Sequence, residues 1–74
     1  MKVTPETLPQ VGEMLYDKRQ KKGRTQKQVA AKAGISHVTV CRLELGEIES
    51  HRIADIAGVC EALGLEVIIR EKRR

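Results

Sequence analysis

The side chains best suited to chemistry stand at the starts of two short predicted helices, near residues 25 and 36. Hydroxyl, amide and cationic groups gather there, and such groups donate hydrogen bonds to anions or to the edges of nucleic-acid bases. They belong to Thr25, Gln26, Lys27, Ser36, His37 and, one turn further along, Arg42. The chain has no glycine-rich phosphate loop, no nucleophile with a plausible base and no pair of buried carboxylates. The pattern therefore predicts a binding site, with no enzymatic activity and no cofactor.

Two helices joined by a tight turn must position these groups. Thr25 is a good N-cap for the first helix, which ends at Gly34. Ser36 caps the second helix, which ends at Gly46. The predicted buried residues recur at helical spacing and are Val29, Ala30 and Ala33 in the first helix, and Val40 and Leu43 in the second. This is the pattern of a helix-turn-helix, whose second helix can lie in a DNA major groove.

The same segment resembles the Cro/cI repressor (Xre) family of DNA-binding domains. The matching residues are Gln26, Ala30, Gly34 and Val40, the run Arg42-Leu43-Glu44-Leu45-Gly46, and the flanking Arg19, Gly23 and Ala62-Leu63-Gly64. Arg24 and Leu45 depart from the family pattern, at positions that do not read bases. The resemblance implies an all-α, lambda-repressor-like domain of four to five helices. It also implies a sequence-specific transcriptional regulator, a dimeric repressor that reads operator half-sites in double-stranded DNA.

The N-terminal half of the second helix is the part that would reach base edges. Its exposed positions, counted from Ser36, are His37, Val38, Cys41 and Arg42. The resemblance implies that His37, Val38 and Arg42 contact bases. The alternatives are a solvated surface histidine at 37, a core residue at 38 and a phosphate contact from Arg42.

Phosphate contacts are expected from donors at the helix starts that flank the groove. The first helix start combines backbone N–H groups with the positive end of the helix dipole. The predicted phosphate-contacting residues are Arg24, Thr25, Gln26, Lys27, Ser36 and Thr39. Such contacts position the protein without specifying sequence.

One ion pair is implied by the resemblance alone. The family pairs an arginine before the end of its first helix with the glutamate of the Arg-x-Glu-x-Gly run. Here these residues are Arg19 and Glu44. The pair is expected to clamp the second motif helix to the helix that precedes the motif.

The segments around the motif complete the predicted domain, residues 7–64. Residues 1–6 read as a flexible arm, and Thr7 with Gln10 reads as a capping box that starts a helix running to about Lys22. A fourth helix is predicted from about Ser50 to Leu63. Its expected buried residues are Ile53, Ile56, Ala57, Val59, Cys60 and Leu63.

Residues 65–70 read as a β-strand, followed by a basic tail, residues 71–74. A lone strand leaves its backbone groups unpaired, so the simplest partner is the same segment of a second copy. The residues that would form this dimer strand are Leu65, Val67, Ile68 and Ile69. The alternative is an extended tail that docks on its own domain. A strand here resembles the HipB-type antitoxin subgroup, which implies a second possible role, neutralising a toxin such as a HipA-type kinase.

Composition limits the remaining possibilities. The 74 residues make one small domain with an aliphatic core, since the chain has one Tyr and no Trp or Phe. A net charge of +4 and a sequence pI near 9.4 suit a polyanionic partner. With no apolar run that could span a bilayer and no signal-peptide pattern, a cytoplasmic protein without membrane contact is expected. His37 and Cys41 have metal-ligand spacing, but two ligands are too few, so no metal site is predicted.

Overall fold

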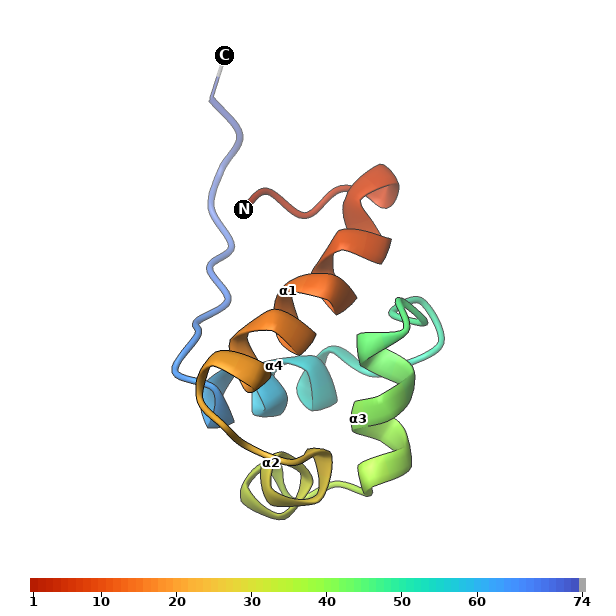
Figure 1. Ribbon diagram of the computed structural model, residues 1–74. Helices are drawn as coiled ribbons and strands as arrows, with labels where there is room; N and C mark the ends of the chain where they lie inside the picture. Colours follow the sequence, from red (N-terminus) through yellow and green to blue (C-terminus); the bar gives the residue numbers. More distant parts are fainter. Residues whose placement is uncertain (74) are drawn as a thin grey trace.

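The computed structural model describes residues 1–73 and shows four α-helices in this part of the chain (Figure 1). They are α1 (Leu8–Lys21), α2 (Gln26–Ala33), α3 (His37–Glu44) and α4 (Ile53–Ala62), preceded by a short 3-10 helix, η1 (Pro5–Thr7). The all-α prediction is therefore confirmed. None of the described helices is both long and apolar enough to cross a membrane.

The start of α1 differs from the prediction. The hydroxyl of Thr7 does not cap a backbone N–H of α1. It instead accepts a hydrogen bond from the backbone N–H of Thr4 at 2.8 Å. Pro5 lies in the first turn of η1, where its missing N–H is tolerated. The predicted Thr7–Gln10 capping box is thus wrong, because the Thr7 hydroxyl is already hydrogen-bonded to the preceding turn. Helical structure also begins earlier than predicted, at Pro5, inside the predicted arm.

The helix-turn-helix forms as predicted from α2, a tight turn and α3. Gly34 ends α2 with a left-handed backbone, φ +74°, which a residue with a Cβ adopts only with strain. The N–H groups of Gly34 and Ile35 donate to the carbonyls of Ala31 and Ala30, so the last turn of α2 is closed. Ser36 then caps α3 by accepting from the N–H of Thr39 at 3.2 Å.

The core is aliphatic and joins all four α-helices. Its most deeply buried side chains are Leu15, Val29, Ala30, Val40, Leu43, Val59 and Leu63. The predicted inner face of α4 is partly wrong: Ile53 and Ala57 are exposed. The buried stripe of α4 runs through Ile56, Val59, Cys60 and Leu63, whereas Ile53 and Ala57 stand one turn apart on the side next to it, which does not face the core.

The predicted strand over residues 65–70 is not present, since no strand is formed within residues 1–73. After α4 the chain continues as an extended segment that runs past α1 toward the N-terminal end of the chain (Figure 1). We call residues 65–73 the C-terminal tail. The physical reason is simple: every regular element in this part of the chain is helical, so the tail has no strand beside which to form a ladder.

Candidate nucleic-acid interface

The solvent side of α3 carries the side chains expected to contact bases. His37, Val38 and Arg42 are all exposed, and Val38 keeps 48% of its accessible surface. Val38 is therefore not a core residue, which removes one of the alternatives for that position. Val40 and Leu43 point the other way and are fully buried, so packing fixes which face of α3 is turned outward.

The start of α3 presents two hydroxyl groups that are already ordered. The side chains of Ser36 and Thr39 hydrogen-bond each other at 3.0 Å, and the Ser36 oxygen also accepts from the Thr39 N–H. One hydroxyl proton is used in this contact, which leaves the other free to donate to an anion. The backbone N–H groups of His37 and Val38 have no hydrogen-bond partner among the described residues.

The start of α2 forms a second cluster of donors. Thr25 and Gln28 make a reciprocal capping box: the Thr25 N–H donates to Gln28 Oε1 at 2.9 Å, and the Gln28 N–H donates to Thr25 Oγ1 at 3.1 Å. This leaves the N–H groups of Gln26 and Lys27 without a partner among the described residues, at the positive end of the helix. The sequence analysis predicted Thr25 as an N-cap but did not predict this capping box, although a threonine three residues before a glutamine is its signature.

Arg19 and Glu44 form a two-pronged ion pair between α1 and α3. Arg19 Nε lies 2.6 Å from Glu44 Oε2, and Arg19 Nη2 lies 3.0 Å from Glu44 Oε1. The two side chains retain only 9% and 5% of their accessible surface. The hydrogen bonds to Glu44 raise the pKa of the Arg19 guanidinium, against the opposing effect of burial. Arg19 Nη1 also donates to the Arg24 carbonyl at 2.8 Å, so the ion pair reaches the loop before α2.

Gln26 extends this pair into a three-residue network. Its Nε2 donates to Glu44 Oε1 at 3.0 Å, so α1, α2 and α3 are all tied to one carboxylate. The amide nitrogen carries two hydrogens, and only one of them is used in this contact. The second hydrogen remains available to an anion in front of α2.

A close contact that the sequence analysis did not predict holds α1 against the end of α3. Gly12 is buried in α1, and a Cβ placed on it would lie 2.5 Å from the Leu43 carbonyl oxygen and 2.8 Å from that of Glu44. Only a glycine permits this approach. A glycine inside a predicted helix was the available signal, because it usually marks a packing requirement.

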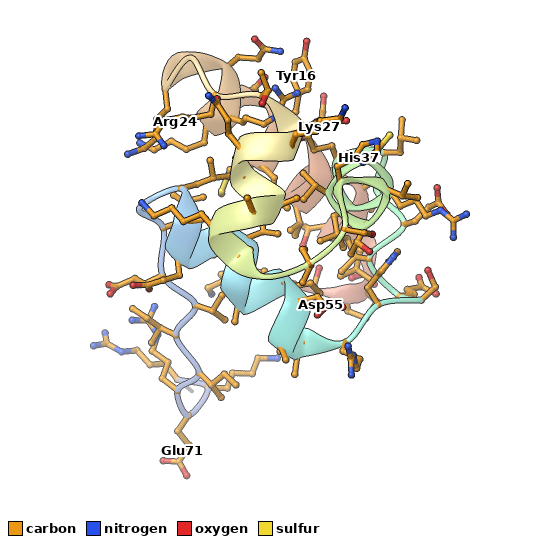
Figure 2. All side chains as sticks on the ribbon, turned by 90° about the horizontal axis from the view of Figure 1, so that it is seen from below. Tyr16, Arg24, Lys27, His37, Asp55 and Glu71 are labelled. Carbon is orange, nitrogen blue, oxygen red and sulfur yellow. The ribbon has the colours of Figure 1, made fainter. Side chains whose placement is uncertain are left out.

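Charge is strongly segregated along the chain. Residues 18–42, from the last turn of α1 to the last turn of α3, contain eight lysines and arginines and no acidic residue. Figure 2 shows Tyr16, Lys27 and His37 along one side of the molecule, with Glu71 of the C-terminal tail at the opposite end. The helix-turn-helix side therefore carries a positive potential that favours a polyanion.

The two cysteines lie in different surroundings. Cys41 is half-buried on α3, and Cys60 is buried in α4, where burial raises the pKa of its thiol. Within residues 1–73, no three His, Cys, Asp or Glu side chains are grouped closely enough to hold a metal ion.

Comparison with known proteins agrees with this geometry. A protein-family model described as a helix-turn-helix domain matches residues 10–71, which run from the first turn of α1 through α4 and most of the C-terminal tail. A comparison with curated proteins found no match. The match covers most of the chain and indicates a DNA-binding regulator. The chain belongs to this family of helix-turn-helix domains.

Proposed function

We propose that this chain is a cytoplasmic, sequence-specific transcriptional regulator of the Xre type, which represses genes by reading operator half-sites in the major groove. The observation that carries this proposal is the outward face of α3, where His37, Val38 and Arg42 are exposed beside a basic, acid-free segment. The protein acts by binding and has no catalytic role.

Each of the three exposed residues of α3 makes its own contact with the bases of a half-site. Arg42 suits bidentate recognition of guanine, and the Val38 methyl groups can cover a thymine methyl. His37 stands at the first position of α3 and either donates to or accepts from a base edge.

Phosphates on both sides of the groove hold α3 in place. The free N–H groups at the start of α2, the unused hydrogen of the Gln26 amide and the Ser36–Thr39 hydroxyl pair supply neutral donors. The exposed Arg24 and Lys27 add charge. Because the Gln26 amide also binds Glu44, a phosphate at α2 would be coupled to the orientation of α3.

The test begins with selection of bound sites from a random DNA library, followed by titration of two variants on the selected and on unrelated duplexes. Arg42→Ala should lose about 1–3 kcal/mol on the selected site and relax the preference at one base pair per half-site. Gln26→Ala should weaken binding to all sequences more evenly. Equal losses for Arg42→Ala on both duplexes would show that Arg42 contacts phosphate, and failure to enrich any sequence would refute specific recognition.

A further inference from the structure

The single tyrosine of this chain, Tyr16, lies at the surface of α1, and the chain has no tryptophan or phenylalanine. Tyr16 keeps 46% of its accessible surface. Its hydroxyl makes no hydrogen bond to another described residue. A large ring with a free hydroxyl at the surface is typical of a binding interface, because it presents an apolar body and a polar end.

Contact with Arg19 fixes the position of this ring. The Arg19 guanidinium carbon lies 5.4 Å from the centre of the Tyr16 ring, which is within the range of a cation–π contact. Arg19 is itself held by Glu44 and by the Arg24 carbonyl, through hydrogen bonds of 2.6, 2.8 and 3.0 Å. The ring therefore rests on a fixed cation, and little conformational freedom is left to lose when its hydroxyl binds a ligand.

A short chain of contacts joins Tyr16 to the donors at the start of α2. Arg19 and the Gln26 amide, which has an unused hydrogen, both donate to Oε1 of Glu44. Only Arg19 and this carboxylate separate the Tyr16 ring from the Gln26 amide. Figure 2 shows Tyr16 on the same side of the molecule as Lys27. A nucleic-acid backbone that passes the start of α2 therefore also passes the Tyr16 ring.

The acidic residues of α1 lie along a different side of this helix. Glu13 and Asp17 line a shallow hollow together with Gln10 and Lys21, and Tyr16 is not part of that hollow. The acid-free basic segment, residues 18–42, begins two residues after Tyr16. Tyr16 thus stands at the edge of the positive surface, where an anion is favoured.

We propose that the Tyr16 hydroxyl donates a hydrogen bond to a backbone phosphate of the bound duplex, so that α1 contacts DNA together with α2 and α3. This inference rests on the proposed function and adds a contact from a helix outside the helix-turn-helix. A phosphate is expected and not a base, because α3 is the helix that enters the groove. A phenol is an uncharged donor, so the contact positions the protein without adding to the salt dependence of binding.

The variant Tyr16→Phe tests this contact in the full chain, because it keeps the ring over Arg19 and removes only the hydroxyl. Binding should weaken by about threefold to tenfold for each subunit bound, on the selected and the unrelated duplexes alike. The slope of log affinity against log salt should stay the same, whereas Lys27→Ala should reduce it by about 0.9 for each phosphate released. A loss on the selected duplex alone would show a base contact and would overturn the proposal.

Neutralised phosphates locate the contact on the duplex. Duplexes with a methylphosphonate at one backbone position at a time lose the charge and one oxygen of that phosphate. At one position, the loss of affinity should be at least about threefold smaller for Tyr16→Phe than for the natural chain, because both changes remove the same hydrogen bond. Losses that combine independently at every position would overturn the proposal.

A purely structural role for the ring predicts a different result. If the ring only shields the Arg19–Glu44 pair from water, Tyr16→Phe should bind DNA as tightly as the natural chain, and this result would overturn the proposal. Gln10→Ala is the matched control, because it removes an uncharged polar group from the other side of α1. It should bind without measurable loss, and a loss equal to that of Tyr16→Phe would also overturn the proposal.

A spectroscopic readout separates this contact from the proposed function. Because Tyr16 is the only tyrosine, labelling with a fluorinated tyrosine gives a single fluorine resonance. The resonance should shift when the duplex binds, and an unmoved resonance in the complex would overturn the proposal. If the natural chain bound no duplex at all, the proposed function would fall together with this contact. If the natural chain bound DNA and only the coupling to a phosphate were missing, the Tyr16 contact alone would fall.

Discussion

Replacing Glu44 by alanine should be among the most damaging single changes in this protein. The carboxylate accepts three hydrogen bonds, two from Arg19 and one from Gln26, and both members of the ion pair are more than nine-tenths buried. Removing one partner of a buried ion pair typically costs about 3–5 kcal/mol, because the other charge is left uncompensated. Here Arg19 would still donate to the Arg24 carbonyl, so we expect a loss of about 2–4 kcal/mol.

That loss is large for a chain of this size. A 74-residue domain has a free energy of unfolding of about 4–11 kcal/mol at typical values per residue. Urea unfolding followed by circular dichroism would measure the change as a shift of the midpoint at constant slope. Replacing both residues, as Arg19→Met with Glu44→Leu, should cost less than the sum of the single changes, because no buried charge is then left alone.

The pair Arg52–Asp55, of which only Arg52 is exposed while Asp55 keeps 16% of its side-chain surface, is the control. Its charged atoms are 3.8 Å apart and the Arg52 side chain is 84% exposed, so Asp55→Asn should change the free energy of unfolding by less than about 1 kcal/mol. If Glu44→Ala costs no more than this control, water screens the Arg19–Glu44 pair and the reasoning is wrong. A double variant as damaged as the sum of the two single variants would also contradict it.

Four further predictions test other parts of the structure. About four to five phosphate contacts per subunit, doubled in a dimer, predict a slope near −7 to −9 for log affinity against log salt, and a slope near zero in duplex titrations would exclude a DNA-binding role. Gly12→Ala should lower the free energy of unfolding by about 1–3 kcal/mol, because the added Cβ would clash with the Leu43 carbonyl. Gly58→Ala is the control: its Cβ would make only ordinary contacts, so urea unfolding should show no change or a gain of up to ~1 kcal/mol. Burial raises the pKa of the Cys60 thiol in the folded state, so as pH rises through 9.0 the unfolded chain loses the thiol proton before the folded chain does. The free energy of unfolding should therefore fall as pH rises through that range, and it should fall less steeply in Cys60→Ala. Ile68→Pro removes a backbone donor from the tail, so the variant should sediment as a monomer with a thermal midpoint that depends less on protein concentration, and a variant that stays dimeric would contradict tail pairing.

The sequence by itself was sufficient to predict the helix-turn-helix. Caps at Thr25 and Ser36, a glycine at position 34 and apolar residues at helical spacing are local signals, because each acts on backbone groups within a few residues. They correctly predicted α2, α3 and the turn between them. The same periodicity correctly predicted that Val40 and Leu43 are buried.

Contacts between distant residues were decided only by the tertiary structure. Arg19 and Glu44 are 25 residues apart, and the resemblance alone paired them; nothing local indicates that Gln26 joins the same carboxylate. The approach of Gly12 to the end of α3 likewise depends on how α1 packs.

The tail shows the limit of local propensity most clearly. Residues 65–70 have the β-branched composition of a strand, yet they form none within the single chain, because a strand requires hydrogen bonds to a neighbour. Composition determined that this segment is extended and apolar. Whether it becomes a strand depends on a partner, since the helical domain supplies only a groove.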